Sequence, residues 1–184
     1  MRPSFGIQQV SPQQKMTSND VDGMNRSARV MALLGLQHTR PFHRDTLFVF
    51  LFALGPSVWL SMIVFFALQP SPRHALWSPA FLSVALWQPL FEELLFRGVI
   101  QGHLLESMPK QKTWLGLSIS NLLTSCLFSL AHLANHSVSW SLLVFLPSLC
   151  FGFVRDRFGS VYPSIILHAF YNSGYFLLIG STTR

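Results

Sequence analysis

The sequence is short of charged residues and of cysteines. Only 11% of its 184 residues are charged, against about 25% in a typical soluble domain, so an ordinary water-soluble enzyme is a poor fit. Acidic residues are fewer than basic ones, with seven Asp and Glu against thirteen Lys and Arg. Two cysteines cannot hold together a disulfide-rich secreted fold, and a hydrophobic share of 50% argues against general disorder.

Long uncharged runs fill most of the chain instead. The stretch from Thr46 to Gln69 contains no charged residue, and it exceeds the roughly 20 residues that cross a bilayer as a helix. Backbone groups in lipid must be hydrogen-bonded internally, so such runs fold as helices. The sequence therefore predicts an all-α, polytopic membrane helix bundle with about five transmembrane helices. The expected spans are Thr46 to Gln69, Trp77 to Ile100, Thr113 to Ala134, Val138 to Val154 and Ser160 to Gly180.

The basic residues lie mostly outside these spans and form no dense run, which argues against nucleic acid as a partner and for the lipid bilayer. Five spans place ten bases on the side of the amino terminus and two on the other, as the positive-inside rule requires of a cytoplasmic tail. We expect residues 1–45 to form a disordered or loosely ordered cytoplasmic tail, and residues 46–184 to form one membrane domain.

Ionisable side chains inside the expected spans are functional candidates, because each costs about 2.5 to 3.5 kcal/mol at the bilayer centre. Glu93 and Arg97 are four residues apart with the acid first, which favours an ion pair on one helix face. Glu92 lies about 100° around the helix and lacks such a partner. Pro89 predicts a kink one turn earlier. The intramembrane ionisable residues are Glu92, Glu93, Arg97, His132 and His168.

Two further helices carry polar stripes at helical spacing, one with Asn121, Ser125, Phe128 and His132, the other with Ser164, His168, Asn172 and Tyr175. Either histidine alone also fits a hydrogen bond between helices, and the Glu-Arg pair alone fits a structural ion pair. Three polar helix faces in one small bundle favour a shared site, because each unpaired polar group in lipid is costly.

The chemistry of this group favours hydrolysis, with water as the nucleophile. Glu92 and His132 would activate the water, while His168 and Asn172 would donate hydrogen bonds to the oxyanion formed when a carbonyl is attacked. A zinc site is the rival, since Glu92, His132 and His168 could supply three ligands. The chain has no His-Glu-x-x-His signature, and we expect no metal and no other cofactor.

Three motifs occur in order on separate expected helices: Glu92-Glu93-x-x-x-Arg97, Phe128-x-x-x-His132 and His168-x-x-x-Asn172. Together they resemble the CPBP family of intramembrane proteases, also called the CAAX protease or Abi family. The resemblance covers about Ala80 to Gly180, including the run from Phe151 to Ser164 that precedes the third motif.

The resemblance implies a glutamic-type intramembrane endopeptidase that cleaves near the terminus of a membrane-anchored protein or peptide substrate. It gives Glu92, His132, His168 and Asn172 the catalytic roles stated above and leaves Glu93, Arg97 and Phe128 as structural support. Only one span precedes the first motif, so the chain is similar to compact bacterial members that process C-terminal sorting signals, including the JDVT-CTERM type. Such members are multi-pass proteins of the bacterial inner (cytoplasmic) membrane.

Two other functions remain open at this stage. A non-catalytic membrane binding or bacteriocin-immunity protein could keep the same fold, since related family members are associated with immunity. A proton or ion pathway could also use intramembrane Glu and His, although the first and fourth expected spans contain no acid, base or histidine.

Overall fold

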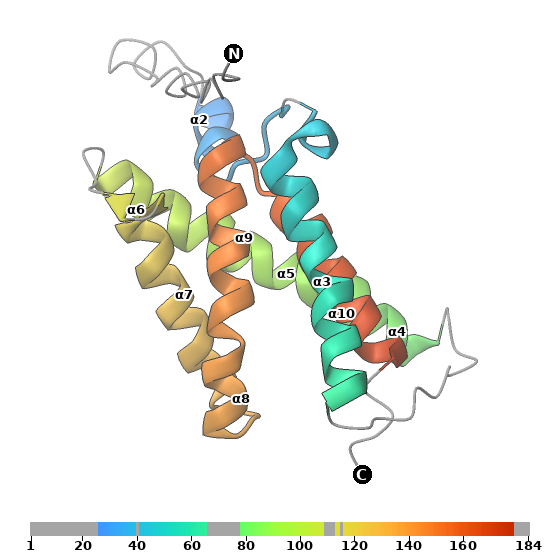
Figure 1. Ribbon diagram of the computed structural model, residues 1–184. Coiled ribbons are helices and arrows are strands. Elements are labelled where there is room, and N and C mark those ends of the chain that lie inside the picture. Colours follow the sequence, from blue (N-terminus) through green and yellow to red (C-terminus); the bar gives the residue numbers. More distant parts are fainter. Residues whose placement is uncertain (1–25, 40, 66–77, 109–112, 115, 179–184) are drawn as a thin grey trace, which may run out of the picture.

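A computed structural model describes residues 26–39, 41–65, 78–108, 113–114 and 116–178, and most of them are helical (Figure 1). An antiparallel pair of two-residue strands, β1 (Thr113–Trp114) and β2 (Leu117–Ser118), occupies the start of the third expected span. The helical elements are α2 (Arg26–Leu33), η1 (Phe42–Arg44), α3 (Thr46–Phe65), α4 (Pro79–Leu82), η2 (Ser83–Trp87), α5 (Gln88–Glu93), η3 (Leu94–Ile100), α6 (Gln101–Ser107), α7 (Ile119–His132), α8 (Val138–Leu143), α9 (Phe145–Phe158) and α10 (Tyr162–Leu178).

The long helices run between two ends of the molecule. In Figure 1, α3, α7 and α10 lead away from the end that carries α2, and α9 leads back toward it. Elements α4 to α6 join into one bent helix that crosses the molecule obliquely. Among the described residues, two helical stretches, Thr46–Phe65 and Val138–Phe158, are long and apolar enough to span a membrane. The prediction of an all-α membrane helix bundle is confirmed.

Helix α7 shows that the usual distribution of residues is reversed. Its buried positions are mostly small and polar, whereas its exposed positions are mostly large and aliphatic, as expected where lipid replaces water. The buried side chains are Ser120, Asn121, Thr124, Ser125, Phe128 and Ser129. The exposed large hydrophobic ones are Ile119, Leu122, Leu123, Leu127 and Leu130.

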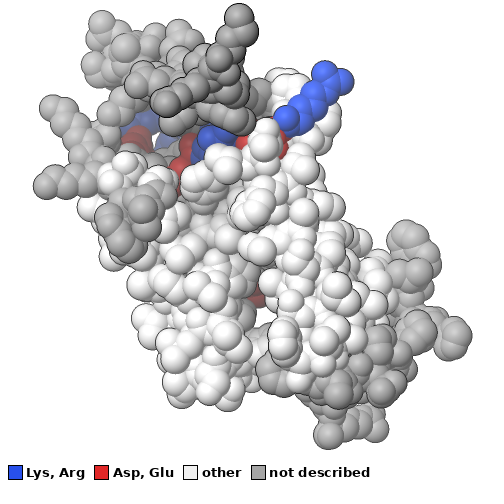
Figure 2. Space-filling model, viewed as in Figure 1, with Lys and Arg blue, Asp and Glu red and all other residues white. Residues whose placement is uncertain are grey.

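Charged side chains gather at the end of the molecule that carries α2, and most of the remaining visible surface is uncharged (Figure 2). Asp45 lies at this end, where its Oδ1 accepts hydrogen bonds from the Leu47 and Phe48 amides and caps α3. Arg157 donates to both Asp45 carboxylate oxygens, at 3.0 and 2.8 Å. Partial burial would raise the pKa of Asp45, but these hydrogen bonds and the arginine charge outweigh it and hold the pKa below its ordinary value.

The bent helix from Pro79 to Ser107 contains two π-helical turns, η2 and η3. They lie on either side of α5, which carries Pro89, Glu92 and Glu93. Single π turns inside α-helices occur frequently at functional sites. The helix extends seven residues beyond the expected end at Ile100, because α6 continues it. The two glutamates therefore lie at the middle of this helix.

The third helix begins at Ile119 and not at Thr113. The Ser118 side chain accepts a hydrogen bond from the Asn121 amide and so fixes the helix start. The residues before it form the β1-β2 pair, whose turn contains Gly116 at a φ of +80°. The fourth expected span consists of α8 and α9, which meet at Val144.

Two residues in the described part of the expected tail form hydrogen bonds with the membrane domain. Arg155, on α9, donates from Nη2 to the Leu33 carbonyl at 3.1 Å, and the Val161 amide donates to the Gly35 carbonyl at 3.0 Å. A buried guanidinium needs such acceptors. Leu33 and Gly35, in the expected tail, are thus hydrogen-bonded to the membrane domain. Residues 1–25 and residue 40 lie outside the described residues, and the division of the chain at residue 45 stays a prediction.

A small aromatic and aliphatic core joins α3, α9 and α10. Its buried members are Phe48, Phe151, Val154, Phe158 and Leu167. One residue further along α10, His168 stacks on Phe151, with ring centroids 4.5 Å apart. The core therefore fixes the position of α10 from which His168 reaches the glutamates of the bent helix.

Candidate active site

Glu93 is the fully buried acid of the site, with none of its surface exposed. Its Oε1 accepts a hydrogen bond from Arg97 Nη1 at 3.0 Å, which confirms the ion pair predicted from the spacing. The same oxygen lies 2.7 Å from His168 Nδ1. The other oxygen, Oε2, is buried and has no hydrogen-bond partner in the described structure. Glu93 thus joins its own helix to α10 through one atom.

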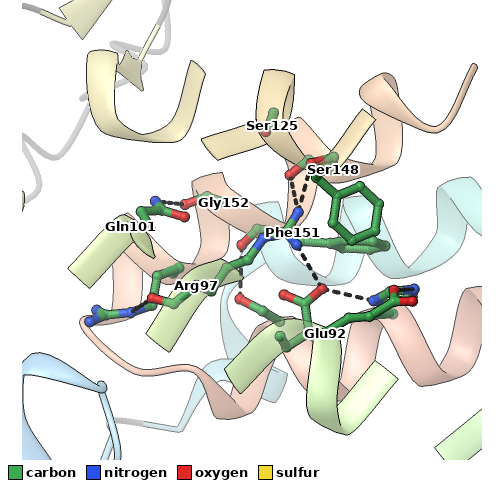
Figure 3. A network of polar contacts seen from close by, with 12 residues as sticks. Glu92, Arg97, Gln101, Ser125, Ser148, Phe151 and Gly152 are labelled. Atoms are coloured by element: carbon green, nitrogen blue, oxygen red, sulfur yellow. Dashed lines mark hydrogen bonds and ion pairs between the residues drawn. The ribbon is translucent and has the colours of Figure 1, made fainter. Parts of the chain in front are cut away.

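Arg97 is also fully buried. Its Nη2 donates to the Ser148 carbonyl at 3.0 Å and to the Ser148 hydroxyl at 2.7 Å, so the bent helix is tied to α9 (Figure 3). The guanidinium carbon lies 4.7 Å from the ring centre of Phe128 and 5.4 Å from that of Phe151, within the range of a cation-π interaction. Arg97 is therefore held by hydrogen bonds and by two aromatic rings as well as by Glu93.

His168 lies between the two adjacent glutamates. Its Nδ1 contacts Glu93, and its Nε2 lies 3.8 Å from Glu92 Oε2. Because Glu93 is paired with a guanidinium, we assign it as the ionised acceptor and place the hydrogen of His168 on Nδ1. The ring stacks on Phe151 with an interplanar angle of 16°, which restricts its rotation. The imidazole therefore presents Nε2 toward Glu92.

Glu92 differs from its neighbour in exposure and in partners. Its side chain is 32% exposed, and its ion-pair contact within the described residues is the distant one with His168. Figure 2 shows one small patch of acidic surface at the bottom of a hollow in the otherwise uncharged face. A carboxylate that is accessible but set inside an apolar wall can contact water and a substrate.

His132 lies at the last position of α7 and is half-buried. Its Nδ1 is 2.9 Å from the Phe128 carbonyl, so we assign Nδ1 as the donor and leave the lone pair on Nε2. Its ring lies 4.5 Å from that of Phe128 and 5.7 Å from that of His136. In the described structure His132 makes no ion pair with Glu92, and Phe128 lies between the two candidate histidines.

Asn172 contacts the bent helix at a different place. Its Nδ2 donates to the Val84 carbonyl at 3.0 Å, one helical turn along α10 from His168. The sequence pattern predicted an oxyanion donor here, but one of the two amide hydrogens is committed to the backbone.

The structure thus brings four predicted residues into direct contact and leaves two at the edge of that group. The group of four consists of Glu92, Glu93, Arg97 and His168. Phe128 packs against it, whereas His132 contacts Phe128 and Asn172 contacts Val84. No three His, Cys, Asp or Glu side chains among the described residues are arranged to hold a metal ion. The proposed zinc trio of Glu92, His132 and His168 is therefore not assembled in the described structure.

Sequence reasoning did not identify three residues that support this group. Ser148 and Phe151 hold Arg97 and His168 from α9. Arg155 donates from Nε to the Arg97 carbonyl at 3.1 Å and is itself buried. The signal for Phe151 and Arg155 was their presence in the run before the third motif, but that run gave no indication of their partners.

Comparison with known proteins identifies a family for the region that contains these residues. Neither the comparison with curated proteins nor that with solved structures returned a match. Residues 74–174 match the family described as Type II CAAX prenyl endopeptidase Rce1-like. This region includes all of the candidate site and more than half of the 184 residues. The chain therefore belongs to the Rce1-like family of type II CAAX prenyl endopeptidases, which are membrane proteases.

Proposed function

We propose that this protein is a glutamic-type intramembrane endopeptidase in which Glu92 activates a water molecule. The observation that carries the proposal is the position of His168 between two unlike glutamates. Glu93 is buried and already paired, so it orients the imidazole, whereas Glu92 is part-exposed and its ion-pair contact among the described residues is with His168 at 3.8 Å. A base must be within reach of the proton that it removes, and Glu92 is the acid of this pair that solvent can reach.

In the proposed reaction, Glu92 takes a proton from water as the water oxygen attacks the scissile carbonyl carbon. The carbonyl oxygen becomes an oxyanion, and His168 donates to it from Nε2 in the doubly protonated form, which carries a hydrogen on Nε2 as well as on Nδ1. Glu92 then passes its proton to the leaving nitrogen as the carbon-nitrogen bond breaks. His132, with its lone pair on Nε2, remains the proposed helper of Glu92, and the second amide hydrogen of Asn172 remains the proposed second oxyanion donor.

A direct assay compares wild-type protein with Glu92→Gln in detergent. The substrates would be a prenylated CAAX-type peptide and a peptide that ends in an apolar helix followed by basic residues. The first represents the substrate in the family's name, and the second represents a C-terminal sorting signal. We expect cleavage of the second peptide, which should fall by at least about 100-fold in Glu92→Gln, since general-base catalysis contributes roughly 10²- to 10⁴-fold. Cleavage that persists in Glu92→Gln would contradict the proposed base.

We also propose that the protein is a multi-pass protein of the bacterial inner membrane with the α2 end in the cytoplasm. Ser107 and Ser139 are both exposed and lie at opposite ends of the region that contains α7. With Cys126 and Cys150 replaced by alanine, a cysteine at position 139 should react with an impermeant reagent in intact cells. A cysteine at position 107 should react only after permeabilisation. Reaction of both from the same side would contradict this arrangement.

A further inference from the structure

The α2 helix ends in a turn whose backbone carbonyls face the membrane domain. Gly35 adopts a φ of +68°, and the Leu36 amide donates to the Met31 carbonyl at 2.9 Å, which is a Schellman ending. The last carbonyls of a helix have no amide of their own helix to bind and need other donors. Residues 33–35, here called the tail turn, therefore offer backbone oxygens to neighbouring elements.

Two glycines one turn apart on the bent helix lie against the tail turn. A methyl group added to Gly102 would overlap the Leu33 carbonyl oxygen, and one added to Gly98 would lie 3.3 Å from the Leu34 carbonyl oxygen. Small residues at this spacing let two backbones approach closely. The tail turn is thus in direct contact with the helix that carries the two glutamates of the site.

Arg155 links the tail turn to the bent helix. It is buried, and it donates from Nη2 to the Leu33 carbonyl and from Nε to the Arg97 carbonyl, both at 3.1 Å. In the π turn η3 the Gln101 amide donates to the Phe96 carbonyl, whereas in an α-helix it would serve Arg97. The guanidinium therefore supplies a donor where the bent helix departs from α-helical geometry.

The hydrogen bonds continue from this point into the site. The Arg97 side chain donates to Glu93 Oε1 at 3.0 Å, and the same oxygen lies 2.7 Å from His168 Nδ1. Arg155, Arg97, Glu93 and His168 are all buried, so water cannot readily replace a bond that is lost between them. A displaced tail turn should therefore move Arg97, and with it the His168 ring relative to Glu92.

We propose that Arg155 is a positioning residue, which anchors the Arg97 backbone to the tail turn and thereby sets the position of the Glu93-His168 pair. The tail turn is then a working part of the site, although it touches neither glutamate. This inference rests on the proposed function for its activity readout only. The coupling between Arg155 and Glu93 also predicts an effect on stability, which can be measured without a substrate.

The first test is a double-mutant cycle between Arg155→Ala and Glu93→Gln, read from melting temperatures of the full chain in detergent. Arg155→Ala should lower the melting temperature by at least about 4 °C, because two buried carbonyls lose their donor. Both substitutions loosen Arg97, so the double variant should lose clearly less than the sum of the two single losses. Losses that add would overturn the proposal.

Arg29→Ala is the matched control for this cycle. Arg29 also joins α2 to the bent helix, through Glu106 at 3.0 Å, but both side chains are about half exposed and lie at the far end of α6. An exposed pair of this kind contributes little to stability. Arg29→Ala should therefore change the melting temperature by little, and its effect should add to that of Glu93→Gln.

The second test measures kcat per folded molecule at a temperature below every melting transition. Arg155→Ala should lower kcat on the order of 10- to 100-fold with KM nearly unchanged, because small displacements of catalytic groups have effects of this size. Arg29→Ala should keep the wild-type kcat. A residue that only stabilises the fold would not change kcat under these conditions, so an unchanged kcat in Arg155→Ala would overturn the proposal.

Gly102→Ala perturbs the tail turn and leaves Arg155 in place. Hydrogen exchange at residues 30–36 should become faster and kcat should fall, whereas Gly98→Ala, at the wider contact, should do less of both. Unchanged exchange, or faster exchange with an unchanged kcat, would overturn the proposal. Should Arg155→Ala fail to fold, Gly102→Ala takes its place in the cycle with Glu93→Gln. If the wild type cleaves no substrate, the proposed function fails, and the melting cycle alone decides this inference.

Discussion

The two adjacent glutamates should respond very differently to the same substitution. Glu93→Gln leaves the fully buried Arg97 without its carboxylate and replaces the charged acceptor of His168 Nδ1 by a neutral amide oxygen. Breaking a buried ion pair by removing one partner costs about 3 to 5 kcal/mol. Arg97 retains both hydrogen bonds to Ser148 and its contacts with two aromatic rings, so the lower end of about 3 kcal/mol applies.

The measurement is thermal unfolding of purified variants in the same detergent. For a chain of this size, 1 kcal/mol shifts the melting temperature by about 2 to 4 °C, so Glu93→Gln should melt about 6 to 12 °C below wild type. Glu92→Gln is the matched control: it makes the same chemical change one residue away, at a side chain that is 32% exposed and whose ion-pair contact among the described residues is the 3.8 Å one with His168. It should melt within about 2 °C of wild type while losing activity.

Two results would refute this reasoning. A Glu93→Gln variant with the same melting temperature as the wild type would show that the buried pair does not stabilise the native state. Equal loss of activity per folded molecule in both variants, with equal melting temperatures, would show that the two carboxylates act as one unit.

Three further predictions concern other parts of the molecule. Because the pKa of Asp45 is lowered in the folded protein, its contribution to stability should be present above about pH 4 and disappear as the pH falls through the lowered value. A series of melting temperatures from pH 7 to pH 3 should show this loss in the wild type. The Asp45→Asn variant should not show it. Gly152→Ala should reduce the folded yield on size exclusion, because the added methyl group would overlap the Asn121 side chain across the α7-α9 contact. A metal chelator should leave proteolysis unchanged after prolonged incubation, whereas activity that is lost and then restored by zinc would favour the rival metal mechanism.

The sequence predicted the helices well, because long uncharged runs leave few other structures open to a chain in lipid. It predicted the Glu93-Arg97 pair, because residues four apart on a helix meet. It did not predict that Glu93 also binds His168, which is 75 residues away. Spacing within one helix carries no information about which face of another helix will pack against it.

Two other differences have similar causes. The π turns that flank α5 leave no mark in a run that is apolar on almost every face, so hydrophobic periodicity could not reveal them. Arg155 was counted among the charges that set orientation, yet it is buried and donates to the Leu33 and Arg97 carbonyls. Its partners are backbone atoms, which any residue possesses, so no pattern of side chains could identify them.

The close spacing of Glu93 and Arg97 bears on the order in which the membrane domain is assembled. During synthesis the bent helix leaves the ribosome before α9 and α10, so Ser148 and His168 are not yet available to it. An isolated acid or base at the centre of a bilayer is expensive, but these two can neutralise one another within the nascent helix. The helix can therefore enter the lipid before its later partners exist, and His168 joins Glu93 only when the last helix packs against the others.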